Sequence, residues 1–451
     1  MAEPQRPQLT RVLGLPQATV LNMIDMVGIG PFTALPIILL AFPGKFSLIP
    51  WLIGALASLF DAFIWSELGA AWPEAGGSYI FLQKLYKGKL GKILAFLYAF
   101  QTSLHLPLVM TSAALGFLNY LRYLHPLTYI QGKYTMLGLV AIIMVLLYRN
   151  IVNVGKIGMV FSLIVVTMLL WTIVTGALNF DSAILEKNSI MPVALGNVWS
   201  SAFWFLIGTS TSKTVYAYLG YYNVCHLGGE IKNPQRNIPI SIILSVILIT
   251  LLYVAMQFTV AGAVPAEKIG DENVPLVAIL FENFYGKNIA MLATVLLLLV
   301  CISSLFALLL GYTRIIYAAA RDGMHFRFLA HLHPTKNFPD YALLLFSSIA
   351  MIFCLVFDKP SDVFRFIVVT RIFIQFIPQA IGVYLLRIHN RIHELPFRIP
   401  IFPLPIVISV VLWLFLFFTT GYKFALGGGV VIGVGVLCYY FLIGRGTDKL
   451  L

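Results

Sequence analysis

Long apolar stretches, separated by short polar connections, dominate the sequence. A helix that crosses the hydrocarbon core of a bilayer, ~30 Å thick, needs about 20 mostly apolar residues. Twelve stretches bounded by charged residues, proline or glycine meet this requirement, at about 19–42, 48–72, 92–120, 134–150, 157–178, 199–229, 237–263, 288–320, 341–357, 363–386, 402–420 and 424–444. The chain is therefore predicted to be an all-α integral membrane protein with twelve transmembrane helices.

The composition excludes a soluble fold. Charged residues make up 11% of the 451 residues and hydrophobic residues 60%, whereas soluble proteins carry about a quarter charged residues. The surfaces of several soluble domains would need far more charge than this. The polar stretch 1–17 precedes the first span, and no small-residue cleavage site follows a short apolar core, so we expect that span to be retained.

Most of the 30 lysine and arginine residues lie in segments on the same side of the predicted membrane as the two termini. Because basic residues are enriched in cytoplasmic loops, we expect both termini to face the cytoplasm, with the cell inner or plasma membrane as the location. The net charge of +12 is then a topology signal, so membrane lipid and not nucleic acid is the expected partner. The four cysteines each lie alone in an apolar stretch, which gives no basis for a disulfide or a metal cluster.

Two spans contain helix-breaking residues. The first contains Gly28, Gly30 and Pro31, and the sixth is interrupted over 218–223, around Gly220. A glycine costs ~1 kcal/mol relative to alanine in a helix, and an interior proline costs ~3 kcal/mol and removes one backbone N–H. In a membrane, unwound backbone persists only where it is buried or lines a cavity. The two breaks therefore predict a cavity at mid-membrane, with close helix packing as the other use of such glycines.

Interrupted helices at matching places in two halves are typical of inverted-repeat transporters, which bind their substrate near the membrane midplane. Five spans fit each half. The predicted organisation begins with a cytoplasmic N-terminal tail at 1–18 and a first inverted repeat of helices one to five at 19–178. A second repeat of helices six to ten follows at 199–386, then helices eleven and twelve at 402–444 and a cytoplasmic C-terminal tail at 445–451.

The two breaks also predict the chemistry of the ligand. The half-helix that follows Gly30 presents unpaired N–H groups and a positive dipole end, which attract an anion such as a carboxylate. The half-helices that end before Gly28 and Gly220 leave free carbonyls, which attract an ammonium group or a metal cation. Anion and cation subsites close together fit the zwitterion of an amino acid.

Five sequence elements occur in order along nearly the whole chain. The first two are the glycine break at 28–30 and the stretch 66–79, which contains Pro-Glu-Ala-Gly-Gly-Ser-Tyr. The other three are the Glu-Ile-Lys-Asn-Pro loop within 229–239, the segment 314–323, and Pro-Phe-Arg-Ile-Pro at 396–400. Together they resemble the amino acid-polyamine-organocation (APC) superfamily of amino acid permeases. The resemblance implies a LeuT-like fold, a 5+5 inverted repeat with broken helices one and six, and a substrate held between helices one, three, six and eight.

Carried over to this chain, the resemblance implies carboxylate-binding amides at Gly28, Ile29 and Gly30, and amine-binding carbonyls at Asp25, Met26, Tyr216 and Leu219. It places an aromatic gate near Tyr216 or Tyr218. The full set of implied substrate-binding residues is Asp25, Met26, Gly28, Ile29, Gly30, Tyr216, Tyr218, Leu219 and Gly220.

The function implied is secondary active transport of amino acids by alternating access, coupled to an ion or running by exchange. The chain departs from the family where Ile29 replaces a hydroxyl residue and Pro31 lacks an N–H, and its Gly-Pro-Phe element looks more like the polyamine-uptake branch. Uptake of polyamines or other organic cations therefore stays open, as does a transport-inactive sensor or scaffold of the same fold. We expect no enzyme activity and no cofactor, because phosphate loops, metal-spaced histidines and nucleophile triads do not appear in the required context.

Coupling to sodium or to protons remains open on the sequence. Proton-coupled relatives place a lysine inside helix five, but 157–178 contains no ionisable residue and Lys156 lies at its cytoplasmic start. Sodium-coupled relatives use hydroxyls of helix eight with carbonyls of helix one, and Ser303 and Ser304 lie about 15 Å above Arg314, near the midplane. Ion coupling is therefore assigned to Asp25, Ser303 and Ser304, with helix packing as the alternative role of the serines.

Placing a charged side chain at the centre of a membrane span costs at least ~2.5 kcal/mol of insertion free energy. A residue kept there at this cost is therefore first taken as a functional residue. Asp25 precedes the first break and is predicted to meet a cation, whether substrate amine, sodium or proton. Arg371 is predicted to pair with an acidic group such as Asp61 or Asp25 more readily than to bind substrate. Lys213 is expected either in an outer vestibule or snorkelling outward, and His105 either faces the cavity or is a satisfied buried histidine.

Overall fold

The computed structural model describes residues 9–189, 196–197, 199–269, 275–357, 370–389 and 395–442. Within these ranges the regular secondary structure is helical apart from two isolated bridges, and loops and turns connect the helices. The α-helices are α1 (Leu15–Met26), α2 (Gly30–Ala41), α3 (Leu48–Ala71), α4 (Ser78–Leu85), α5 (Lys89–Leu124), α6 (Tyr129–Leu147), α7 (Ile151–Leu178), α8 (Ser182–Asn188), α9 (Ser201–Tyr218), α10 (Asn223–His226), α11 (Pro234–Ala263), α12 (Leu276–Tyr285), α13 (Lys287–Arg321), α14 (Asp340–Val356), α16 (Ile377–Ile388), α17 (Leu404–Thr420) and α18 (Tyr422–Leu442). Short 3₁₀ turns lie at Gly44–Ser47, Gly228–Glu230, Ala266–Lys268 and Arg327–Ala330, and a π-helical turn lies at Ile372–Phe376.

Six continuous helical stretches of the described chain are long and apolar enough to cross a membrane, namely Gly44–Ala71, Lys89–Leu124, Tyr129–Leu147, Ile151–Leu178, Pro234–Ala263 and Lys287–Arg321. The bent pair α1 and α2 makes a seventh if it counts as one span. The other predicted spans correspond to shorter apolar helices or include residues outside the described ranges. The structure therefore supports an all-helical membrane protein, and the number twelve stays a prediction.

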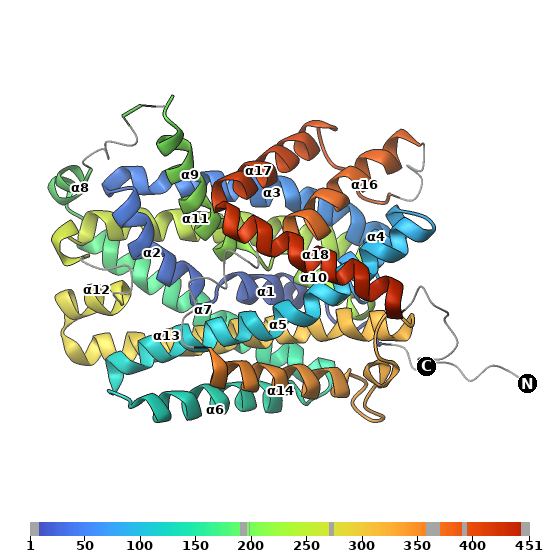
Figure 1. Ribbon diagram of the computed structural model, residues 1–451. Helices are drawn as coiled ribbons and strands as arrows, with labels where there is room; N and C mark the ends of the chain where they lie inside the picture. Colours follow the sequence, from blue (N-terminus) through green and yellow to red (C-terminus); the bar gives the residue numbers. More distant parts are fainter. Residues whose placement is uncertain are drawn as a thin grey trace, which may run out of the picture.

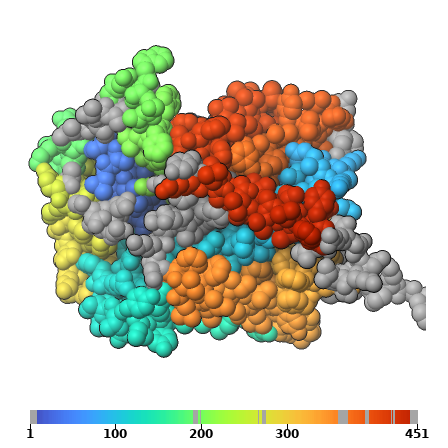
Figure 2. Space-filling model, viewed as in Figure 1, coloured from blue at the N-terminus to red at the C-terminus, as the bar shows by residue number. Residues whose placement is uncertain are grey.

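The helices run alongside one another as a bundle (Figure 1). The central pairs are α3 with α11 and α5 with α13, and α1 packs against α7, α11 and α13. The two C-terminal helices lie at the outside, where α17 contacts α3 and α9 while α18 contacts α5. Figure 2 shows α18 running across one face of the molecule. Helix α1 therefore lies inside the bundle, whereas the N-terminal half of α9 is at its edge, where Trp204 and Phe205 are about half exposed.

Both predicted breaks are present. Helices α1 and α2 meet at an angle of 46° across the gap at 27–29. Helix α9 ends at Tyr218, and the chain then makes a non-helical turn in which Gly220 has φ +124° before the single turn α10. Only glycine adopts such a φ without strain. The local chemistry of glycine and proline thus ends the two helices where the sequence predicts.

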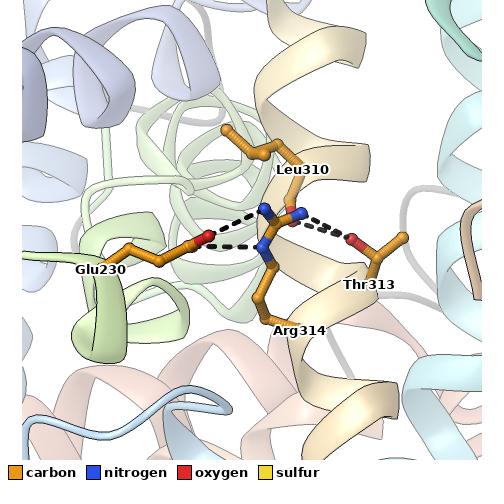
Figure 3. A network of polar contacts seen from close by, with 4 residues as sticks. All are labelled: Glu230, Leu310, Thr313 and Arg314. Atoms are coloured by element: carbon orange, nitrogen blue, oxygen red, sulfur yellow. Dashed lines mark hydrogen bonds and ion pairs between the residues drawn. The ribbon is translucent and has the colours of Figure 1, made fainter. Parts of the chain in front are cut away.

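Two buried ion pairs hold the loops to the bundle. Arg314 of α13 donates through Nε and Nη2 to the two carboxylate oxygens of Glu230, at 3.2 and 3.1 Å, and through Nη1 to the Leu310 carbonyl (Figure 3). The Glu230 carbonyl accepts backbone N–H groups from the segment just before α1, at 2.9 Å. Glu67 of α3 pairs in the same two-pronged way with Arg387 of α16.

Candidate functional site

A cavity lies where the two helix breaks meet. It has a volume of about 70 Å³. Its walls come from the α1–α2 break, the end of α9 with the turn that follows it, α5, α13, and the residue before the π-helical turn. The residues that line it are Asp25, Met26, Gly28, Ile29, Gly30, His105, Val109, Ala113, Tyr216, Ala217, Leu219, Gly220, Tyr222, Ser304, Leu305, Leu308, Tyr312 and Arg371.

The two breaks are fastened to each other and to α11. The Tyr253 hydroxyl of α11 donates to the carbonyls of Met26 and Ala217, at 3.0 and 3.2 Å, and these carbonyls belong to the ends of α1 and α9. Gly220 packs so tightly on the end of α1 that an added Cβ would lie 2.8 Å from the Asp25 carbonyl carbon. The breaks therefore form one rigid wall of the cavity.

The structure brings together all but one of the substrate-binding residues predicted from the sequence. Asp25, Met26 and the 28–30 break line the cavity, as do Tyr216, Leu219 and Gly220. Tyr218 does not line it, because its ring packs among Trp51 and Tyr253, at centroid distances of 6.0 and 5.3 Å. Of the two tyrosines proposed as an aromatic gate, Tyr216 alone contributes to the cavity wall.

The ion-coupling assignment divides between the two serines. Ser304 lines the cavity, and its hydroxyl lies 3.5 Å from the Asp25 carbonyl. Ser303 does not line it, since its hydroxyl donates to the Val300 carbonyl of its own helix at 2.7 Å. Lys156 is exposed at the start of α7 and does not line the cavity. The structure therefore places Ser304, and not Ser303, on the cavity.

Gly28 sits against Ser304 so closely that we expect no side chain to be accepted there. A Cβ on Gly28 would lie 2.5 Å from Ser304 Oγ and 2.9 Å from Ser304 Cβ. The hydroxyl can rotate away but the Cβ cannot, and overpacking of this kind costs about 1–3 kcal/mol. We expect Gly28→Ala to lower uptake by about 10-fold or more and to lower the melting temperature, and Gly28→Ala with Ser304→Gly to recover part of the melting temperature. Uptake into proteoliposomes and thermal unfolding measure the two effects, and a double variant that melts no higher than Gly28→Ala would count against this contact.

Four polar or aromatic residues of the cavity wall belong to neither the predicted substrate-binding set nor the ion-coupling set: Arg371, His105, Tyr222 and Tyr312. Arg371 is 2% exposed and donates hydrogen bonds to the Tyr222 and Tyr312 hydroxyls. His105 stacks on Tyr312 with ring centroids 5.6 Å apart. The sequence signal for Arg371 was the energetic cost of placing an arginine inside a membrane span. A tyrosine in an apolar helix gives no comparable signal.

The structure brings Arg371 into direct contact with neither Asp61 nor Asp25, although Arg371 and Asp25 interact across the same cavity. Asp61 is fully buried outside the cavity lining and accepts hydrogen bonds from Tyr221, Trp413 and Ser409, at 2.6, 3.3 and 3.5 Å. Asp25 lines the same cavity as Arg371, yet the ion pairs found among the described residues, with N–O distances up to 4.0 Å, do not include Arg371. Lys213 is partly buried and lies outside the cavity lining.

Some of the backbone carbonyls predicted to bind the substrate amine already accept hydrogen bonds from other groups of the protein. The Met26 carbonyl accepts from the Tyr253 hydroxyl and, at 3.2 Å, from the Gly28 N–H. The Tyr216 carbonyl accepts the Leu219 N–H at 3.2 Å. The cavity therefore presents opposite side-chain charges, Asp25 and Arg371, beside fewer open backbone groups than the two breaks alone predict.

An all-helical bundle with long apolar helices, two of them interrupted around a small polar cavity, defines a membrane protein of the transporter class. The sequence matches the amino acid permease family over residues 13–443. This match covers most of the chain, and the protein belongs to that family.

Relatives in the family are transporters of several kinds of amino acid. A branched-chain amino acid permease of Bacillus subtilis (strain 168) is 25% identical over 98% of this chain and 95% of its own length. A serine/threonine exchanger of the same organism is 24% identical, with 89% of each chain covered. The cystine/glutamate transporter of Homo sapiens is 26% identical over 88% of this chain and 78% of its own length. These are proteins to which the chain is similar, and their substrates differ from one to the next.

Proposed function

We propose that this protein is a secondary active transporter of amino acids that works by alternating access, with the cavity at the two helix breaks as its substrate site. The single observation that carries the proposal is the position of this cavity, at the junction of α1, α2 and α9, in a chain that belongs to the amino acid permease family. Discontinuous helices around a small polar cavity are how many secondary transporters hold their substrates.

The charges in the cavity favour an amino acid over a polyamine. Asp25 supplies a carboxylate for an ammonium group, and Arg371 supplies a guanidinium in the same cavity. A zwitterion matches one charge of each sign, whereas a polyamine would bring several positive charges toward a buried guanidinium with only one carboxylate to offset them. The uptake of polyamines is therefore the weaker candidate.

The architecture we propose with this function is the predicted one: twelve spans, a 5+5 inverted repeat over 19–178 and 199–386, and both termini in the cytoplasm of a cell whose inner or plasma membrane holds the protein. The breaks in α1–α2 and after α9 stand at corresponding places in the two halves, which supports the repeat. The excess of basic residues on the terminal side supports the orientation.

Counterflow tests transport directly. Proteoliposomes loaded with the twenty amino acids are expected to accumulate radiolabelled amino acid from outside without any ion gradient, because exchange needs only a site that opens to both sides. Putrescine and spermidine are offered in a parallel arm. Accumulation of the polyamines alone would favour the organic-cation alternative, and no accumulation of either by correctly folded protein would favour the sensor or scaffold.

For coupling, we propose that Asp25 binds a cation during transport. Its side chain is 8% exposed at the end of α1 and lines the cavity, and Ser304 adds a hydroxyl beside the Asp25 carbonyl. Carboxylate, hydroxyl and carbonyl oxygens suit a hard cation as well as an ammonium group. Asp25→Asn is expected to lower uptake by at least about 10-fold or to remove its sodium or pH dependence.

The same experiment separates the coupling ions. Uptake is measured with sodium replaced by choline and, separately, with the proton gradient collapsed, for the natural sequence, Asp25→Asn and Ser304→Ala. Ser303→Ala is the matched control, since this neighbouring hydroxyl lies outside the cavity lining. An Asp25→Asn protein with unchanged rate, sodium response and pH profile would make Asp25 a structural residue.

A further inference from the structure

We propose that Arg371 binds the carboxylate of the substrate, so that this transporter recognises its amino acid through a side-chain guanidinium in place of some backbone amides of the first helix break. The inference deepens the proposed function and rests on it. Three features of the cavity lead to it: a buried cation that touches no carboxylate among the described residues, a reduced set of backbone donors, and a carboxylate farther along the wall of the same cavity.

Arg371 is a buried cation whose hydrogen-bond partners are neutral. It is 2% exposed, and each of its terminal nitrogens donates to a phenol, one to Tyr222 and the other to Tyr312. None of the ion pairs formed by the described residues contains it. Desolvating a charge is costly unless an opposite charge compensates for it. Asp25 offsets part of this charge from across the cavity, and an anion that enters the cavity would add direct contact with the guanidinium only while it is bound.

The guanidinium is held ready for such an anion. Arginine carries five N–H donors in a rigid fork that matches a carboxylate, and the two phenols use two of them. The Tyr222 ring stacks on Trp65, with centroids 4.5 Å apart, and the Tyr312 ring stacks on His105. A π-helical turn begins at the next residue, Ile372, and such turns are frequent at functional sites.

Two positions of the first helix break supply no free N–H group to a carboxylate, which leaves the neutral N–H groups of Ile29 and Gly30. The Gly28 N–H already donates to the Met26 carbonyl at 3.2 Å, and the Thr33 N–H donates to the Ile29 carbonyl at 3.0 Å. Pro31 has no N–H, and Ile29 offers no side-chain donor. The helix dipole still favours negative charge at this end of α2, but the stronger charge-assisted hydrogen bonds must come from another group. Arg371 is the cationic side chain among the residues that line the cavity.

Asp25 completes the arrangement. It lines the same cavity as Arg371 without forming an ion pair with it among the described residues. A substrate whose ammonium group meets Asp25 and whose carboxylate meets Arg371 would bridge two charges that do not neutralise each other by direct contact. An uncharged amide in place of the carboxylate would lose the charge-assisted hydrogen bonds at Arg371.

The test compares acids with amides. Counterflow of the twenty amino acids is measured in competition with the same amino acids as α-carboxamides, for the natural sequence, Arg371→Gln and Arg371→Lys. We expect the natural sequence to prefer the acids by about 10- to 100-fold, the range of a charge-assisted hydrogen bond. Arg371→Gln should transport acids and amides at nearly equal rates, and Arg371→Lys should keep part of the preference because it keeps the charge. Lys213→Gln is the matched control, a cation of an apolar helix outside the cavity lining, and should keep the full preference.

Folding is checked by the melting temperature of each purified variant. Should Arg371→Gln fail to fold, Tyr312→Phe removes one hydroxyl that holds the guanidinium and should reduce the preference for acids while leaving the charge in place. Folded Arg371→Gln with an unchanged preference for acids would overturn this inference and leave amino acid transport intact. If the natural sequence exchanges no amino acid at all, the proposed function itself fails, and the two failures are thereby distinguished.

Discussion

We expect Gly220→Ala to abolish transport, because Gly220 is where the two helix breaks come closest. Its φ of +124° is one that alanine adopts only with strain of about 1–3 kcal/mol. An added Cβ would also lie 2.8 Å from both the Asp25 carbonyl carbon and the Met26 nitrogen. These are backbone atoms at the end of α1, so the methyl group cannot be accommodated by a rotamer change. The end of α1 must move, and the cavity wall moves with it.

Gly286→Ala is the matched control for that experiment. Gly286 also has a positive φ, +82°, but an added Cβ there meets no atom within 4 Å. Alanine at this position should introduce backbone strain without a steric clash. Because Gly286 lies away from the cavity, uptake should stay within about twofold of the natural sequence. Uptake in proteoliposomes and the melting temperature are measured for both variants. Normal uptake by folded Gly220→Ala would contradict the close approach of the two breaks.

The largest effect on stability is expected from Arg314→Met. The substitution leaves the Glu230 carboxylate, which is 0% exposed, without the two-pronged partner shown in Figure 3. Breaking a buried ion pair by removing one partner costs about 3–5 kcal/mol. Because Glu230 also anchors the segment before α1 through its carbonyl, the loss should loosen that end of the bundle. The midpoint of thermal unfolding of the purified protein measures the effect.

Two further variants separate burial from charge in this experiment. Arg314→Met with Glu230→Leu replaces both charges by apolar groups, and most of the lost stability should return, since replacing a whole buried pair is often close to neutral. Lys187→Met breaks an exposed pair, in which Lys187 lies 2.9 Å from Glu267 and its hydrogen bond lowers the pKa of that carboxyl. It should leave the midpoint unchanged, because solvent screens exposed pairs. Equal losses for Arg314→Met and Lys187→Met would show that burial of the first pair carries no energetic weight.

How far the sequence could predict the site depends on the kind of residue. Gly28, Gly30 and Pro31 could be recognised because glycine and proline disturb a helix wherever they stand. The breaks themselves identified Gly220 and drew attention to Asp25, and the family resemblance added Tyr216 and Leu219. All four line the cavity in the structure. The tyrosines Tyr222 and Tyr312 could not be found in this way, because a tyrosine in an apolar helix packs equally well in the core or against a cavity.

Neighbouring residues on one helix show the same limit. Ser303 and Ser304 are adjacent, and successive side chains on an α-helix point about 100° apart. Ser304 therefore reaches Gly28 while Ser303 bonds to its own helix. Tyr216 and Tyr218 divide in the same way, one on the cavity and one against Trp51. Which of each pair faces the cavity depends on how the helix is rotated against its neighbours, and the sequence does not contain that angle.

The sequence by itself determined that this is a helical membrane protein whose first and sixth apolar stretches are interrupted, because the length of an apolar stretch and the backbone chemistry of glycine and proline are local properties. Only the tertiary structure decided which side chains form hydrogen bonds with the buried charged residues. Asp61 bonds to Tyr221, Trp413 and Ser409, and Arg371 bonds to Tyr222 and Tyr312. Each of these contacts joins residues more than 50 positions apart, so it exists only once the helices have packed.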